Sequence, residues 1–173
     1  MKDIKKIIIG SLIFLFAINS IAYSEVVNKI EISGNERLSK ETVIVYGDII
    51  KGKNYESDDI NLMIKKLFDT DFFSDIKASI NNGVLNIIVR ENPIVNLIIF
   101  KGIKAEKYKT AITTLLKLRE KTPYIKNLVK KDIDQIKGFY RGLGFYFVKI
   151  DAEIQELDKN RINLIYSVDQ GER

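Results

Sequence analysis

The sequence predicts an α+β protein in which a small β-α-α-β-β domain occurs twice in tandem. Three observations predict this fold class. Similar segments recur in the same order in the two halves of the chain, runs of alternating apolar and polar residues predict strands, and apolar residues at helical spacing predict two helices in each copy. Because each alternating strand has one apolar face, we expect the helices to cover that face of a three-stranded sheet.

The internal repeat is the evidence for two domains, since 173 residues would otherwise suggest one. An asparagine and a glycine in the first half each have a counterpart in the second half, separated by the same number of residues; Gly34 corresponds to Gly102. The similar segments are residues 26–34 and 94–102, residues 64–68 and 136–140, and residues 85–89 and 162–166. Their common order predicts a duplication, with domains over residues 25–92 and 93–170.

Two helices are expected in the first copy, after its first strand. The shorter one spans residues 40–46, is capped by Ser39 and is closed by Gly47. The longer one begins at the N-cap Ser57. Its expected core-facing residues are Ile60, Met63, Ile64, Leu67 and Phe68.

The second copy repeats this pattern. The core-facing residues expected on its two helices are Tyr108, Ile112 and Leu115, and then Val129, Ile133, Ile136 and Tyr140. Gly142 and Gly144 follow a helix and precede a strand, so they predict a helix end and not a phosphate-binding loop. In the first strand of this copy, Val95, Leu97 and Ile99 are expected on the face opposite Ile98 and Phe100.

Each copy should end in a hairpin. Residues 75–80 and 85–89 alternate on either side of an Asn-Gly turn, which is a strong hairpin signal, and residues 148–155 and 162–168 alternate around a polar turn. Each successive element of a copy should reverse the direction of the chain, so strands 1 and 3 are expected to be parallel and strand 2 antiparallel to both. We therefore expect a mixed sheet of order 1-3-2 in each copy, with strand 2 at an edge.

Residues 1–24 have the three parts of a secretory signal peptide: lysines, an apolar run over residues 7–18, and a small-residue site ending at Ser24. Cleavage there would make Glu25 the mature amino terminus. The alternative is an uncleaved membrane anchor, but the apolar run is shorter than a spanning helix needs. Loss of the leader would lower the formal net charge from +5 to +3.

The composition excludes several classes of function. A small, dispersed charge does not favour nucleic-acid binding. The chain has no cysteine and no histidine, so disulfides, thiol nucleophiles and the usual zinc sites lack their donors. Paired acidic residues such as Asp58 and Asp59 fit a helix start, and Asp132 and Asp134 are two residues apart, a spacing that does not put both on one helical face. No cofactor, metal or enzymatic activity is therefore expected.

Three segments resemble the POTRA repeats of the BamA family of outer-membrane β-barrel assembly factors: residues 30–35, 67–73 and 139–145. Two departures stand out. Asp71 lies where that family commonly has a glycine, and it should adopt a left-handed conformation that Asp tolerates. Gly102 is followed by isoleucine instead of asparagine, so the turn into the next helix is expected to differ.

This resemblance implies the amino-terminal, periplasmic part of an outer-membrane insertion factor. The chain would be a fragment lacking the membrane barrel, with residues 171–173 beginning a third repeat. Implied partners are unfolded outer-membrane β-barrel clients and accessory outer-membrane lipoproteins, with membrane contact only through the absent barrel. Binding would occur by β-augmentation, in which a client strand pairs with a sheet edge.

The segments expected at open edges are residues 75–80 and 148–155. The candidate partner-binding residues are Asp75, Lys77, Ser79, Phe147, Lys149, Asp151 and Glu153. The alternative is that these charges merely solvate the edges and prevent aggregation. Glu91, Asn92 and Pro93 are expected to form a restricted interdomain hinge, because proline limits the residue before it to extended conformations.

Other readings of the whole chain stay open. The POTRA region of a two-partner secretion transporter also carries two such repeats, although its expected proline-rich leader is missing here. A membrane-anchored cell-division scaffold would have one POTRA domain, which the duplicated strand argues against. A small secreted enzyme of another class is the third alternative.

Overall fold

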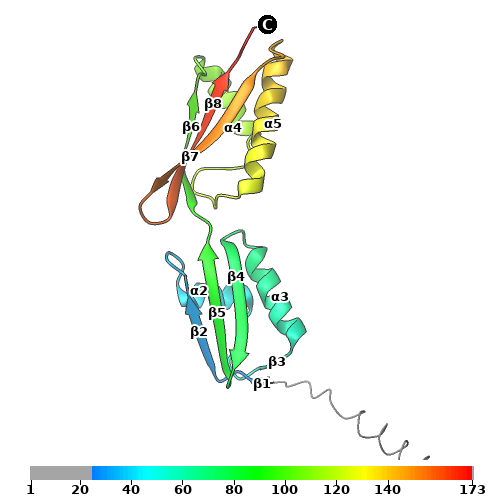
Figure 1. Ribbon diagram of the computed structural model, residues 1–173, viewed down its shortest axis with the longest axis vertical. Coiled ribbons are helices and arrows are strands. Elements are labelled where there is room, and N and C mark those ends of the chain that lie inside the picture. The colour runs from blue at the N-terminus through cyan, green and yellow to red at the C-terminus, as the bar shows by residue number, and fades with distance from the viewer. Residues whose placement is uncertain (1–24, 173) are drawn as a thin grey trace, which may run out of the picture.

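The computed structural model describes residues 25–172 and shows two domains stacked end to end along the long axis (Figure 1). The expected signal peptide, residues 1–24, lies outside the described residues, as does Arg173 from the expected start of a third repeat. Among the helices of residues 25–172, none is long and apolar enough to cross a membrane.

The first domain has the predicted topology. Its elements are β1 (Glu25–Val26), β2 (Lys29–Ser33), α2 (Lys40–Gly47), β3 (Asn54–Tyr55), α3 (Ser57–Phe68), β4 (Phe73–Asn81) and β5 (Val84–Glu91). The sheet order is β2-β5-β4, with β2 parallel and β4 antiparallel to β5. An additional ribbon, in which β1 pairs with β3, was not predicted, because two-residue strands have no periodicity to detect.

The second domain repeats this arrangement. Its elements are β6 (Ile94–Lys101), α4 (Glu106–Leu115), α5 (Lys126–Gly142), β7 (Lys149–Leu157) and β8 (Arg161–Asp169). The order is β6-β8-β7, again with a parallel first pair and an antiparallel hairpin. The predicted 1-3-2 order is thus confirmed in both domains, and each has its own apolar core.

The glycine after the first strand has the same conformation in the two domains. Gly34 and Gly102 have φ values of +81° and +80°, and a Cβ at either would lie 2.0 Å from the carbonyl oxygen of Val89 or Val168. Close approach to the central strand demands glycine at this position in both copies, so the expected difference in the turn begins only after the glycine. The difference follows later, since the path from glycine to helix is shorter in the second domain.

Two predicted helix boundaries need correction. The N-cap of α3 is Glu56, not Ser57, and the Asp59 carboxylate accepts a hydrogen bond from its backbone N–H at 3.0 Å. Gly47 is the last residue of α2, while Asp48 adopts the left-handed conformation that closes the helix. A Cβ at position 47 would lie 2.9 Å from the side chain of Ile49, so a larger residue there would have to displace that side chain.

Two residues predicted to face the core are instead exposed. Phe68, the last residue of α3, is 41% exposed, and Phe73 fills the adjacent core. Leu115 is 39% exposed because α4 ends there, and Leu116 and Leu118 of the following loop are buried in its place. The predicted contributions of Ile136 and Tyr140 are confirmed, since both are fully buried.

The faces predicted for the first strand of the second domain are also partly wrong. The register of β6 against β8 shifts between Val95 and Leu97. Val95, before the shift, is buried in the core, whereas Leu97, after it, is 46% exposed on the opposite face. Phe100 returns to the core side and stacks on Tyr166. The extra residue of a β-bulge reverses the alternation that follows it.

Candidate functional site: sheet edges, an edge groove and the domain junction

The strand order places two predicted client-binding segments at sheet edges. Among the strands of residues 25–172, β4 pairs only with β5, and β7 pairs only with β8. Six of the seven candidate residues lie on these strands, with side chains on the sheet face opposite the core: Asp75, Lys77, Ser79, Lys149, Asp151 and Glu153. The seventh, Phe147, is 77% exposed as expected, but it precedes β7 and belongs to the turn after α5.

The two edges differ in charge. Asp75 and Lys77 balance each other on β4, and Asp75 lies opposite Arg90 of β5 in the sheet. By contrast, β7 carries three acidic residues and a single lysine, giving it a net negative charge. A docking segment would therefore meet a neutral edge in the first domain and an acidic edge in the second.

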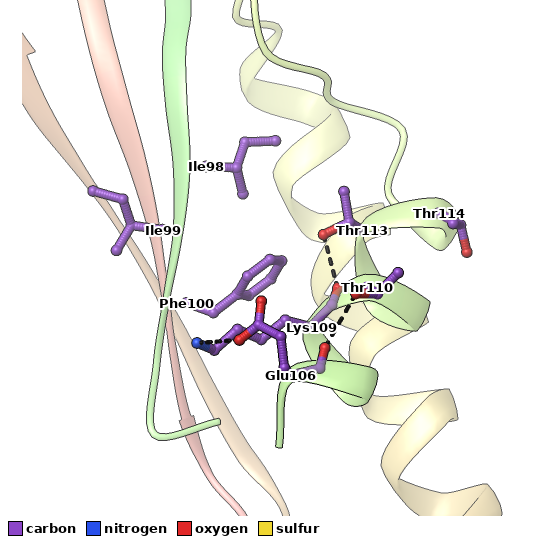
Figure 2. A pocket seen from close by; sticks show the side chains of 8 residues that line it. All are labelled: Ile98, Ile99, Phe100, Glu106, Lys109, Thr110, Thr113 and Thr114. Atoms are coloured by element: carbon purple, nitrogen blue, oxygen red, sulfur yellow. Dashed lines mark hydrogen bonds and ion pairs between the residues drawn. The ribbon is translucent and has the colours of Figure 1, made fainter. Parts of the chain in front are cut away.

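A groove runs between the outer edge of β6 and helix α4 (Figure 2). Its volume is about 550 Å³, and it is lined by Ile98, Ile99, Phe100, Glu106, Lys109, Thr110, Thr113 and Thr114. Figure 2 shows Ile98 and Phe100 pointing toward α4, while Ile99 points away. No sequence feature had indicated this groove, because its walls come from a strand and a helix whose packing the periodicity does not specify.

The helical wall of the groove is electrically neutral. Glu106 and Lys109 form an ion pair at 3.0 Å. Thr110 and Thr113 donate their hydroxyl hydrogens to the helix carbonyls of Glu106 and Lys109, at 3.2 and 2.8 Å. Because these hydroxyl hydrogens are bonded back to the helix, the two threonines can accept from a ligand but do not donate to it.

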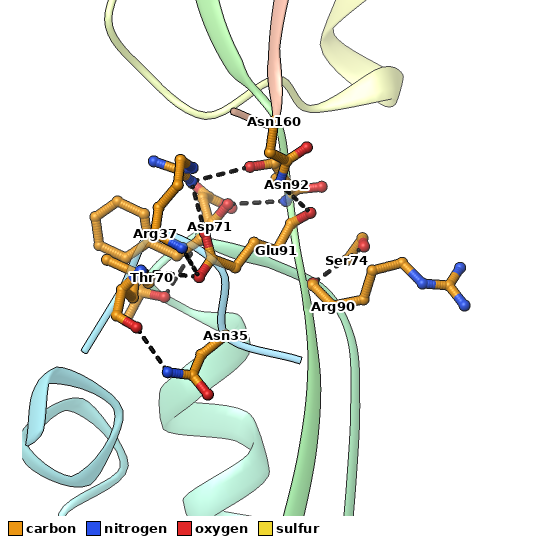
Figure 3. Close-up of polar contacts among 11 residues, drawn as sticks. Asn35, Arg37, Thr70, Asp71, Ser74, Arg90, Glu91, Asn92 and Asn160 are labelled. Atoms are coloured by element: carbon orange, nitrogen blue, oxygen red, sulfur yellow. Dashed lines mark hydrogen bonds and ion pairs between the residues drawn. The ribbon is translucent and has the colours of Figure 1, made fainter. Parts of the chain in front are cut away.

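Two of the expected hinge residues, Glu91 and Asn92, lie in a bonded cluster at the junction (Figure 3). Glu91 is only 5% exposed. One carboxylate oxygen accepts hydrogen bonds from the backbone N–H groups of Arg37 and Leu38, at 3.0 and 2.9 Å, and the other pairs with the Arg37 guanidinium at 3.1 Å. Asn92 donates its backbone N–H to Phe72 at 2.7 Å. The last residue of β5 thus holds the loop before α2.

Contacts continue across the junction into the second domain. Asn160, in the β7–β8 turn, donates its side-chain amide to the Glu91 carbonyl at 3.3 Å and accepts the N–H of Ile94 at 3.0 Å. Tyr124 donates its N–H to the carbonyl of Pro93 at 2.8 Å. The backbone on both sides of Pro93 is therefore tied to neighbouring loops.

Asp132 is a buried carboxylate that sequence reasoning set aside. It is 0% exposed and accepts hydrogen bonds from the backbone N–H of Lys117, from that of Leu118 at 3.1 Å and from the Tyr166 hydroxyl at 3.0 Å. Burial, and then the negative charge of Asp132, raise the pKa of Tyr166, so its hydroxyl stays a donor. The available signal was position, since Asp132 lies four residues before Ile136 on the apolar stripe of α5.

Several of the remaining acidic residues of the described part of the chain pair with lysines. Asp59 pairs with Lys53 at 2.7 Å, and this contact holds the pKa of the Asp59 carboxyl below its usual range. Within residues 25–172, no group of three or more acidic side chains lies close enough to hold a metal ion. The polar contacts therefore support loops and helix ends.

Comparisons with known proteins agree with the repeat seen here. Residues 93–171 match the family model POTRA, described as surface antigen variable number repeat. The chain is similar to the outer membrane protein assembly factor BamA of Neorickettsia risticii, with 26% identity over 160 residues, covering 92% of this chain and 22% of that protein. The BamA of Neisseria meningitidis serogroup B is 24% identical over 167 residues, covering 94% of this chain and 21% of that protein.

The fold has a solved counterpart. It is similar to the N-terminal domain of Omp85 from Thermosynechococcus elongatus, with a TM-score of 0.51 and 15% identity, covering 82% of this chain and 61% of that one. The chain spans about a fifth of the length of the two curated relatives named above.

Proposed function

The described part of the chain consists of two tandem POTRA domains, and from this premise we propose that it is the periplasmic, non-enzymatic scaffold of an outer-membrane protein assembly factor. The second domain matches the POTRA family directly, and the first repeats its strand order, its helix pair and its essential glycine. The names of the curated relatives support the assembly role, and outer-membrane attachment would come from the remainder of a longer protein.

The open edges of β4 and β7 carry the proposed mechanism. Within residues 25–172, the backbones of these strands are hydrogen-bonded only to their neighbours β5 and β8. The outward N–H and C=O groups are therefore available to an extended segment of an unfolded outer-membrane client. Main-chain pairing of this kind gives affinity with little demand on client sequence, as a general assembly scaffold requires.

Side chains along the edges would adjust this affinity. On β7, Ile154 is 46% exposed on the core side of the sheet, where it could contact an apolar client residue. On the opposite face, Asp151 and Glu153 would favour client segments with basic residues at alternate positions. Accessory lipoproteins are proposed to use the same kind of pairing or the exposed Phe147.

A proline scan along β7 tests the mechanism. The N–H groups of successive residues in a strand point alternately to the two sides, so of Asp151→Pro and Ala152→Pro one should break the ladder to β8 and the other should remove an outward donor. The proline that removes an outward donor should weaken binding of an unfolded outer-membrane protein segment about three- to tenfold, and it should cost less stability than the proline that breaks the ladder. Binding is measured by amide shifts in a peptide titration.

Asn163→Pro in the central strand β8 is the control for general unfolding. Asp151→Lys should change affinity less than the outward proline, because the main chain carries the interaction. If the charge change abolished binding and neither proline reduced it, recognition would run through side chains and the edge mechanism would be rejected.

A further inference from the structure

The first half of the β6 edge is already occupied by the chain itself. Val95 donates its N–H to the carbonyl of Thr122 at 3.0 Å, and Lys121 donates its N–H back to the carbonyl of Val95 at 2.6 Å. Ile94 and Pro123 form an antiparallel bridge next to this pair. The segment after α4 therefore runs along β6 as a short additional strand.

Glu120 extends this pairing by one position through its side chain. Its carboxylate oxygen accepts the N–H of Ile98 at 3.0 Å. In a paired strand, a backbone carbonyl would accept from this N–H. An exposed carboxylate thus stands in for the carbonyl of a neighbouring strand at the point where the chain's own segment leaves the edge.

The groove beside α4 continues the same line past Ile98. A strand residue in a layered fold occupies roughly 160 Å³, from a rise of about 3.3 Å, a strand spacing of about 4.8 Å and a layer spacing of about 10 Å. A volume of about 550 Å³ therefore matches three to four extended residues. The backbone of Phe100 borders this space, and no hydrogen bond from its outer side is seen within residues 25–172.

We propose that the β6 edge is a third strand-docking site, which takes a three- to four-residue extended segment of unfolded polypeptide, and that the Glu120 carboxylate is its built-in competitor. This proposal takes only its class of ligand, unfolded polypeptide, from the proposed function. A docking segment would continue the line of residues 120–123, displace Glu120 from the N–H of Ile98 and pair with the outer side of Phe100. The wall of α4 suits small or apolar side chains, because its two charged residues, Glu106 and Lys109, neutralise each other.

The test measures whether removing the competitor improves binding at this edge. An isotope-labelled chain is titrated with a ten-residue peptide of alternating valine and threonine. Glu120→Ala should tighten binding about three- to tenfold, the worth of one lost competing hydrogen bond, with amide shifts at Ile98, Phe100 and the threonines of α4. Glu120→Gln keeps an acceptor oxygen and should show a smaller gain. Glu36→Ala, an exposed glutamate of the first domain, should leave binding at β6 unchanged.

The outcomes separate this proposal from the proposed function, because each edge reports through its own amides. Shifts confined to β4 and β7, with no effect of Glu120→Ala, would reject the third site and leave the other edges standing. Shifts confined to β6 would reject docking at β4 and β7 and leave the third site standing. Concentration-dependent dimerisation of Glu120→Ala without peptide would make a second copy the occupant and overturn the choice of ligand. Thr113→Trp should fill the groove and abolish the β6 shifts alone.

Discussion

The two domains share one topology but hold the loops beside their first helices with different carboxylates. In the first domain, Glu91 at the end of β5 accepts two consecutive backbone N–H groups of the loop before α2. In the second, Asp132 on α5 accepts two consecutive N–H groups of the loop after α4. Each carboxylate satisfies donors that the loop cannot pair by itself, which is the usual condition for burying polar groups.

The partners of the two carboxylates differ. Glu91 is matched by the cationic Arg37, whose guanidinium also reaches the carbonyl of Asn92 at 3.2 Å. Asp132 is bonded, in the described part of the chain, to the neutral hydroxyl of Tyr166 and to backbone N–H groups. The Glu91 cluster therefore links a loop to the domain junction, whereas Asp132 acts inside its own domain. Two domains of the same fold thus hold a loop beside the first helix with carboxylates in different places, one at the junction and the other in the core.

The largest expected effect comes from Asp132→Ala. Removing the carboxylate leaves two backbone N–H groups and the Tyr166 hydroxyl without their buried acceptor, which should cost the second domain about 3–5 kcal/mol. Denaturant unfolding followed by amide exchange in each domain measures this loss. Asp134→Ala, an exposed aspartate two residues further along α5, is the control and should change stability little. Equal effects of the two substitutions would contradict the anchoring role.

A smaller effect is expected from Glu91→Gln. The amide keeps one acceptor oxygen but loses the ion pair with Arg37, so the first domain should lose about 2 kcal/mol. Because the same cluster borders the junction, residual dipolar couplings should also show a changed relative orientation of the domains. Glu36→Gln, an exposed neighbour, is the control. An unchanged orientation would mean that Glu91 affects the first domain alone and not the arrangement of the two domains.

The smallest effect concerns helix capping, where the domains also differ. Ser39 accepts the N–H of Thr42 at 3.1 Å, whereas the corresponding Ala105 of α4 has no side-chain acceptor. Ser39→Ala should destabilise the first domain by about 1 kcal/mol, and Ala105→Ser should stabilise the second by a similar amount. Thermal unfolding of both variants and of the double variant measures the pair. Destabilisation by Ala105→Ser would show that the turn after Gly102 prevents a serine cap.

The topology could be predicted from sequence because its signals are periodic. Alternating strands, helical stripes and the Asn-Gly turn each follow from local geometry and together determine the strand order. The left-handed conformation of Asp71 was also predicted correctly, with φ at 60°. The bulge between Val95 and Leu97 could not be predicted, because nothing in an apolar run indicates which residue leaves the hydrogen-bonding pattern.

The candidate sites were less accessible to sequence reasoning. Edge position follows from topology, so β4 and β7 could be selected in advance, although their client binding stays a proposal. Glu120 could not be found, because its role depends on a loop that returns to a strand more than twenty residues earlier. The place of Asp132 among the core residues of α5 does indicate a buried carboxylate, whereas its spacing from Asp134 indicates only that the two do not share a helical face.

Because the domain junction is short and the second sheet is long, a small rotation at the junction moves the far end of that sheet by a large distance. Only Asn92 and Pro93 separate β5 from β6, while the nine residues of β8 extend about 30 Å at roughly 3.3 Å per residue. A tilt of about 10° at this junction would move the far end of the second sheet by about 5 Å, close to the spacing between paired strands. A rotation too small to disturb either core would therefore decide whether one extended client could lie along β4 and β7 at the same time.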